Sequence, residues 1–363
     1  MARVSILMRP EAGHITPTLR LAGLIRDRGH AVCYVTVSQF QPFFERLGFG
    51  CVTMKVCDVD DRPVDDIWNA PPSVAGIRRV RSWRPGDLVE ALRRSAPDLL
   101  VCDVTAAGLF DMLPAQTLGC PVIALGLFPP MPPPVRLPQI VLCPIEFTTP
   151  DEPARQYRCH YCEPSVWRPQ ERSRADSAGF SPDESGRRVY CSLGTQSRDY
   201  AEARSVLLAI MAAFADLPSY QLLIAASGLY EAVVHEPRPK NVRVVPSVPQ
   251  LSVLAQADLV ITHGGIGTLK EAIMAAVPMI VIPFRYDQPA NAWRVQHHGI
   301  GRACPPASCT PADIRCLVRD ISSDAVTRRR AAAMSAIFWR RESESRAAHL
   351  LLNILSGEPL PDS

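Results

Sequence analysis

A surplus of charge of either sign is what the sequence most clearly lacks. Its 39 Lys and Arg residues nearly balance its 36 Asp and Glu residues, which leaves a formal net charge of +3 over 363 residues. Proteins that bind nucleic acid or an anionic membrane concentrate basic residues to neutralise phosphate groups. The composition therefore gives no reason to expect a nucleic-acid or membrane partner.

The sequence also lacks an uninterrupted apolar stretch that could cross a membrane. Two long uncharged runs, 112–135 and 272–284, contain prolines, whereas a spanning helix needs about 20 consecutive apolar residues. The first residues, MARVSILMRPEAGH, have no long apolar core with a small-residue cleavage site. We therefore expect a cytoplasmic protein without a membrane span.

Paired cysteines at the spacing of a metal site are scarce, although the chain has twelve cysteines. One CxxC pair occurs, Cys159 and Cys162, and without a second pair it is more typical of an ordinary loop than of a structural zinc site. Other cysteines, such as Cys33, Cys102 and Cys191, lie in apolar segments, where a reduced cysteine packs as a small hydrophobic residue. We therefore expect no metal.

Short apolar segments alternate with segments of helical periodicity along both halves of the chain. Such alternation predicts an α/β protein with parallel, doubly wound sheets. Pro17 is expected near the start of the first helix, where its missing N–H group costs little. In the first half we expect strands at 4–8, 31–37, 51–56, 98–104 and 121–125, and helices at 17–28, 39–47, 88–95 and 106–118. In the second half we expect strands at 188–193, 220–225, 242–245, 258–262 and 279–283, and helices at 201–215, 266–276, 288–298 and along 310–356.

The length suits two domains, and the composition indicates where they divide. Regular structure should stop at 129–138, where six of ten residues are proline, and a polar segment follows. We expect a first Rossmann-like domain at 1–150, a linker at 151–187, a second Rossmann-like domain at 188–340 and a C-terminal helix within 341–363. Ligands of open α/β sheets bind beyond the carboxyl ends of the strands.

One segment of the second half has the features of a phosphate-binding turn. From Asp258 to Glu271 a buried strand leads into a helix through Gly264, Gly265 and Gly267. Glycines let backbone N–H groups approach a ligand, and the helix start adds free donors and a positive dipole end. His263 and Thr268 can add side-chain donors. A plain tight turn is the alternative, because glycine serves that purpose too.

A carboxylate and an amide, Asp287 and Gln288, follow the next buried strand of the second half. At the edge of a cleft they would hydrogen-bond sugar hydroxyl groups. Asp287 could equally cap the helix that begins there.

In the first half, His14 lies in the loop after the first strand. Arg9-Pro10-Glu11-Ala12-Gly13-His14 stands where a GxGxxG motif would bind a dinucleotide, which argues against a nicotinamide cofactor. Asp103 ends another strand, and neighbouring strands of one sheet could bring it close to His14.

At these motifs the chain resembles the family 1 glycosyltransferases, most of all the bacterial macrolide-type and UDP-glycosyltransferase-like members. The resemblance covers nearly the whole chain, through GHITPTLRLAGLIRDRGHAV, PDLLVCDVTAAG, VYCSLGT, VPQLSVLAQADLVITHGGIGTLKEAI and AVPMIVIPFRYDQPANAWRV. It implies the GT-B fold, in which two Rossmann-like domains face each other across a cleft and the C-terminal helix crosses back to the first domain.

The resemblance also implies roles for individual residues. His14 matches the general base that deprotonates the acceptor, and Asp103 the carboxylate that orients it. Ser247 stands where many relatives stack a Trp on the nucleobase, and Gly267 where plant members have Asn. The donor-site matches are Gly194, Thr195, His263, Gly264, Gly265, Gly267 and Thr268 at the diphosphate, Gln250 and Glu271 at the nucleoside, and Asp287 and Gln288 at the sugar.

The expected activity is an inverting, metal-independent glycosyl transfer from a UDP- or dTDP-sugar to a hydroxyl or similar nucleophile of a small, hydrophobic natural product, as in antibiotic biosynthesis. The nucleotide sugar is a co-substrate, and no cofactor is expected. Two alternatives stay open: a catalytically silent GT-B homologue that binds a nucleotide sugar or assists a partner, and a GT-B nucleotide-sugar epimerase, against which His14 argues. A homodimer is left open.

Overall fold

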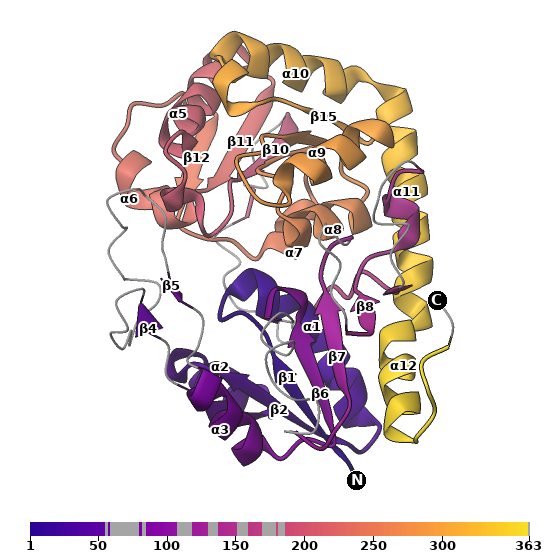
Figure 1. The fold of residues 1–363 in the computed structure, drawn as a ribbon. Helices are drawn as coiled ribbons and strands as arrows, with labels where there is room; N and C mark the ends of the chain where they lie inside the picture. Colours follow the sequence, from indigo (N-terminus) through magenta and orange to yellow (C-terminus); the bar gives the residue numbers. More distant parts are fainter. Residues whose placement is uncertain are drawn as a thin grey trace. The chain divides into compact units, whose positions relative to one another are not determined.

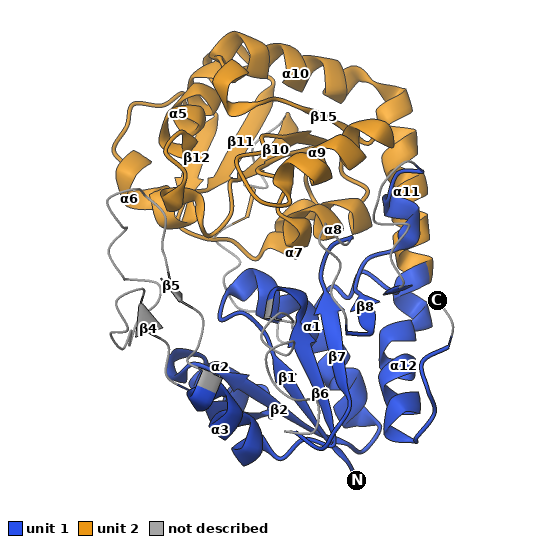
Figure 2. Ribbon diagram, viewed as in Figure 1, with its two compact units in different colours: residues 1–167, 341–363 blue, residues 168–340 orange. Residues whose placement is uncertain are grey.

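A computed structural model of the protein describes residues 1–54, 57–58, 80–81, 85–106, 118–129, 137–150, 159–168, 179–180 and 186–361. The chain forms two compact units (Figure 2). Unit 1 comprises residues 1–167 and 341–363, and unit 2 comprises residues 168–340. Most of the helix expected at 106–118, and parts of the linker expected at 151–187, lie outside the described residues.

Unit 1 is built on a seven-stranded parallel sheet in the order β3-β2-β1-β6-β7-β8-β9 (Figure 1). Its strands are β1 (Arg3–Leu7), β2 (Ala31–Thr36), β3 (Gly50–Thr53), β6 (Leu99–Asp103), β7 (Val122–Gly126), β8 (Gln139–Val141) and β9 (Cys159–Tyr161). Its helices are α1 (Ala12–Asp27), α2 (Gln41–Arg46), α3 (Pro85–Ser95) and α12 (Arg346–Leu355). A two-stranded antiparallel pair, β4 (Cys57–Asp58) and β5 (Val80–Arg81), also lies in this part of the chain.

Unit 2 is built on a six-stranded parallel sheet in the order β12-β11-β10-β13-β14-β15. Its strands are β10 (Arg187–Ser192), β11 (Tyr220–Ala225), β12 (Val242–Val245), β13 (Leu259–Thr262), β14 (Met279–Val281) and β15 (Gly301–Ala303). Its helices are α5 (Ala203–Ala213), α6 (Tyr230–Val233), α7 (Gln250–Leu254), α8 (Ile266–Met274), α9 (Gln288–His297) and α10 (Pro311–Ser323), and α11 (Ala325–Glu344) contains the boundary between the units.

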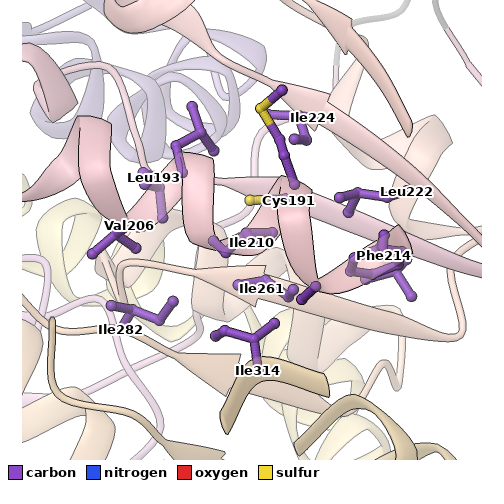
Figure 3. Close-up of a cluster of buried hydrophobic side chains, with 14 of the residues drawn as sticks. Cys191, Leu193, Val206, Ile210, Phe214, Leu222, Ile224, Ile261, Ile282 and Ile314 are labelled. Atoms are coloured by element: carbon purple, nitrogen blue, oxygen red, sulfur yellow. The ribbon is translucent and has the colours of Figure 1, made fainter. Parts of the chain in front are cut away.

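One face of the unit 2 sheet packs against α5 and α10 in a single apolar cluster. Full burial of one large aliphatic or aromatic side chain contributes about 1.5–3 kcal/mol, so this core fixes the strands whose ends carry the site. Figure 3 shows the cluster, with Cys191, Leu193, Val206, Ile210, Phe214, Leu222, Ile224, Ile261, Ile282 and Ile314 labelled.

The C-terminal segment of the chain belongs to unit 1, where α12 contacts α1. Arg20 of α1 binds Glu342 in the last turn of α11, which leads into α12. Its Nε lies 3.0 Å from Glu342 Oε1, and its Nη2 donates to the Glu342 carbonyl at 2.7 Å. Glu342 also accepts from the backbone N–H groups of Ser165 and Val166, at 2.8 and 3.1 Å. The carboxylate of Glu163 accepts from the backbone N–H of Ala347 at 3.0 Å.

The α/β class and the parallel sheets that the sequence predicts are confirmed. Two expectations need correction. The segment expected to link the domains includes β9, which extends the unit 1 sheet beside β8, and neither of these three-residue strands is long enough to show an apolar pattern. The first helix begins at Ala12, so Pro17 lies inside it.

The early start of α1 has a local cause. The carbonyl of Glu11 accepts hydrogen bonds from the N–H groups of His14 and Ile15, both at 3.0 Å. Pro17 has no N–H group, so the only helix hydrogen bond that it removes is the one to the carbonyl four residues before it. The side chain of His14 is held by Asp103, which lies outside the helix.

Among the described residues, no helix combines the length and the apolarity that a membrane crossing requires.

Candidate active site

The site in unit 1 lies where the order of the strands reverses. β1 has β2 on one side and β6 on the other, and the register of β1 against β6 pairs Leu7 with Cys102, so both strands end at the same level. His14 lies in the first turn of α1, not in the loop expected after β1, and Asp103 ends β6. Ligands of open parallel sheets bind at such a point, beyond the carboxyl ends of the strands.

The structure brings His14 and Asp103 into contact: Nδ1 of His14 lies 2.6 Å from Oδ2 of Asp103. Asp103 is 1% exposed. Its Oδ1 accepts from the backbone N–H and the hydroxyl group of Thr105, at 2.8 and 2.7 Å, and its Oδ2 accepts from the N–H of Arg9 at 3.3 Å. A carboxylate with these donors is fixed as an acceptor, so Nδ1 of His14 carries a proton and Nε2 is the basic nitrogen.

The charges around the pair favour its ionised form. Burial by itself lowers the pKa of His14, but the hydrogen bond to Asp103 and the negative charges of Asp103 and Glu11 outweigh burial, so this pKa lies above its ordinary value. Burial raises the pKa of Asp103, whereas the bonds from His14 and Thr105 and the charge of His14 lower it by more, so it lies below its ordinary value. His14 is thus a strengthened base, supported by a permanent carboxylate.

Unit 2 repeats this placement at its own point of reversal, between β10 and β13. Gly194 and Thr195 follow β10, and His263 follows β13. A Cβ atom added to Gly194, which has φ +82°, would lie 2.5 Å from Cε1 of His263, and one added to Gly265 would also collide with the imidazole. Glycine is therefore required on both sides of the ring. Gly264, with φ +87°, makes the turn that connects His263 to Gly265.

His263 is held as a neutral group. Burial lowers the pKa of His263 to about 4, although a hydrogen bond with the Ser192 backbone acts in the opposite direction. A neutral imidazole has a single N–H, and because the bond to the Ser192 backbone raises the pKa, it is this N–H that donates to the Ser192 carbonyl. Next to it begins α8, whose first-turn amides have no partners within the helix. These amides, with the His263 ring packed against Gly194 and Gly265, form a cradle of the kind that binds anions at helix starts.

Gln250 joins three polar residues beside this cradle. Its Oε1 accepts from the hydroxyl of Tyr190 at 2.9 Å, and its Nε2 donates to Glu271 Oε2 at 2.5 Å and to Thr268 Oγ1 at 3.4 Å. Burial raises the pKa of Glu271, against the hydrogen bond from Gln250. The structure therefore places Gln250, Thr268 and Glu271 in one network, and Tyr190, which sequence reasoning missed, anchors it to β10. Ser247 and Thr195 are exposed.

Asp287 is connected to the cradle through a residue that the sequence analysis missed. Asn291, fully buried one turn further along α9, donates to Asp287 Oδ2 at 2.7 Å and to the Gly264 carbonyl at 2.9 Å. The side chain of Asp287 makes no capping hydrogen bond with α9, so the capping alternative is not what the structure shows. The four-residue spacing on a helix was the available signal for Asn291.

Gln288 is turned into the protein and is 3% exposed. Its Oε1 accepts from the N–H groups of Phe284 and Arg285, at 2.8 and 3.0 Å, and its Nε2 donates to the hydroxyl of Tyr200 at 2.9 Å. The amide that the sequence assigns to sugar binding therefore supports the loop that carries Asp287.

In the part of the chain that the structure describes, no three His, Cys, Asp or Glu side chains are grouped to hold a metal ion. Cys162, of the CxxC pair, is buried and donates to the carbonyl of His160 at 3.4 Å.

Known proteins that are similar to this chain are named as glycosyltransferases or belong to antibiotic biosynthesis. Residues 224–341 match the family described as erythromycin biosynthesis protein CIII-like, C-terminal domain. Over 88% of its length the chain is 28% identical to NDP-glycosyltransferase YjiC of Bacillus subtilis (strain 168), of which it covers 89%. The chain is therefore similar to glycosyltransferases of the family 1, macrolide type.

Solved structures show the fold of this chain. The glycotransferase of kitacinnamycin matches with a TM-score of 0.76 and 23% identity, covering 99% of both chains. Spinosyn rhamnosyltransferase SpnG complexed with thymidine diphosphate matches with a TM-score of 0.72 and 19% identity, covering 97% of this chain and 100% of that one. The expected GT-B fold is thereby confirmed.

Proposed function

We propose that this protein is a glycosyltransferase that moves a sugar from a nucleoside diphosphate to a hydroxyl group, or a similar nucleophile, of a small hydrophobic natural product, with inversion and without a bound metal ion. One observation carries the proposal: each unit places chemically matched groups at the reversal point of its own sheet. A base paired with a carboxylate lies in unit 1, and a cradle of donors around His263 lies in unit 2.

The reaction follows from these groups. Nε2 of His14 takes the proton of the acceptor hydroxyl while the oxygen forms a bond to the anomeric carbon. The bond from that carbon to the diphosphate breaks on the opposite face, which inverts the configuration. Asp103 stabilises the imidazolium that forms, and such positioned acid–base catalysis is typically worth about 10²–10⁴-fold.

The leaving diphosphate gains negative charge as the bond breaks. The first-turn amides of α8 are fixed before the reaction and donate to that charge, while the N–H of His263 stays bonded to the Ser192 backbone. Because these donors can do the work of a cation, we expect full donor binding in the presence of EDTA. The complex of SpnG with thymidine diphosphate makes dTDP the first nucleotide to test, with UDP as the second.

Calorimetric titration of dTDP and UDP, with EDTA present, tests the donor half of the proposal on the wild type and on Thr268→Ala. Metal-free binding that Thr268→Ala weakens is the expected result. Absence of binding by both nucleotides would remove the donor site and favour a silent homologue.

Turnover tests the other half of the proposal. His14→Ala should lower kcat by about 10²-fold or more while nucleotide binding stays unchanged, and wild-type turnover in this variant would remove His14 from the role of base.

A further inference from the structure

Glu11 is an acidic residue of unit 1 that the proposed reaction does not use. It occupies the position just before α1, where an acidic side chain commonly caps the helix, yet it makes no capping hydrogen bond. Its Oε1 is held by Nη2 of Arg9 at 2.7 Å, and its Oε2 lies 4.0 Å from Nε2 of His14. The carboxylate therefore faces the nitrogen on which the acceptor proton would arrive.

Both side chains can be reached from solvent, with 19% of Glu11 and 18% of His14 exposed. A separation of 4.0 Å is too long for a hydrogen bond between the two groups. An acceptor that reaches Nε2 must therefore also come close to a carboxylate oxygen.

The number of protons on the acceptor then decides how well it fits. A hydroxyl group has one proton, and if it donates that proton to Nε2, it turns only lone pairs towards Glu11. These lone pairs repel the negatively charged carboxylate of Glu11. A second donor next to the reacting hydroxyl removes the repulsion, because it turns a proton towards the carboxylate. Two vicinal oxygens are separated by about one hydrogen-bond length, on the order of 2.8 Å, so one can bond Nε2 while its neighbour bonds Oε2.

We propose that Glu11 is a specificity-determining residue that receives a second O–H or N–H donor, adjacent to the hydroxyl group that His14 deprotonates. The preferred acceptors are vicinal diols, catechols and amino alcohols. The proposal rests on the proposed function, because it takes His14 as the base, and it adds a class of acceptor.

The charges that face His14 come from three places. Asp103 ends β6, Glu11 precedes α1, and Arg9 lies in the loop after β1 and acts against the two carboxylates. Removing the charge of Glu11 should lower the pKa of His14, because one of the groups that favour the imidazolium is lost.

The test compares two probes, 7,8-dihydroxycoumarin and 7-hydroxycoumarin, which differ by one vicinal hydroxyl group. Their dissociation constants are measured by NMR of histidine-labelled protein on the His14 signal, which His14→Ala identifies. Wild type should bind the dihydroxy compound about tenfold tighter or more, the usual effect of a hydrogen bond to a charged group. Glu11→Ala should reduce that ratio to about one, and Glu11→Gln should leave an intermediate ratio.

Glu45→Gln is the matched control, because Glu45 is an exposed carboxylate of α2 that is bonded to Gln41. It should keep the wild-type ratio and the wild-type pKa of His14, whereas Glu11→Gln should lower that pKa in the same spectra. An unchanged ratio in Glu11→Ala, or no response of the His14 signal to either coumarin, overturns the proposal. Transfer from a dTDP-sugar is measured separately, so loss of turnover with an intact binding ratio refutes the proposed function alone.

Discussion

Gly265→Ala adds one methyl group at the start of α8, and the structure fixes where that methyl must go. It would collide with Nε2 of His263 and lie 2.7 Å from its Cε1, so the imidazole must leave its position. Gly267, two residues later in the same helix, has no atom within 4 Å of an added Cβ. The two substitutions are chemically identical and differ only in what the methyl meets.

The expected loss can be worked out from the cradle. Displacing the imidazole disturbs the start of α8 that packs against it, and the loss of one amide hydrogen bond to a charged diphosphate is worth about 1.5–3 kcal/mol, so Gly265→Ala should bind dTDP or UDP roughly 10- to 100-fold more weakly. Gly267→Ala should change affinity by less than about threefold. It should also raise the stability of unit 2 by up to about 1 kcal/mol, because alanine is favoured over glycine within a helix.

Calorimetric titration measures the affinities, and thermal unfolding of the same samples measures the stabilities. Wild-type affinity in Gly265→Ala would refute the assignment of the diphosphate to the start of α8 beside His263. Equal losses in both variants would instead show that bound diphosphate fills the open space beside Gly267.

Three further predictions concern unit 1. kcat/KM should rise with pH through the raised pKa of His14 and level off above it, because the base must be unprotonated; a profile without this ionisation would contradict the mechanism. Asp103→Asn should lower kcat by about 10²–10⁴-fold while nucleotide affinity, measured by calorimetry, stays constant, and near wild-type turnover would exclude a role for the carboxylate. Glu342→Ala should destabilise the protein by about 2–6 kcal/mol in urea unfolding. The substitution leaves the buried N–H groups of Ser165 and Val166 without their acceptor, at about 1–3 kcal/mol each. An unfolding curve identical to that of the wild type would contradict this prediction.

Much of the fold could be predicted because its strands are short apolar segments between amphipathic helices. Two strands of the second half, 220–225 and 242–245, match β11 and β12 to the residue. The three-residue strands β8 and β9 could not be found, since their pairing depends on the neighbouring strand more than on their own side chains. The prediction of where α1 begins was wrong, because it took Pro17 as the sign of a helix start. The hydrogen bonds to the Glu11 carbonyl and the contact of His14 with Asp103 instead favour a start at Ala12.

The candidate site also contains features that could be predicted from the sequence and features that could not. The approach of His14 to Asp103 follows from two adjacent parallel strands, which a sequence can suggest. The inward turn of Gln288 could not be predicted, because it depends on the Tyr200 hydroxyl and on two loop amides. Nor does the sequence distinguish Glu11 from an ordinary helix cap.

The tie between Arg20 and Glu342 has a consequence for how the protein is made. The bond from Arg20 to the Glu342 carbonyl spans 322 residues, and a ribosome adds roughly 5–20 residues per second. The segment that carries Glu342 and contacts α1 is therefore synthesised on the order of tens of seconds after the first strands of unit 1. Throughout that interval the nascent chain presents an apolar helix face to chaperones and proteases, so unit 1 is completed only after all of unit 2 has been synthesised.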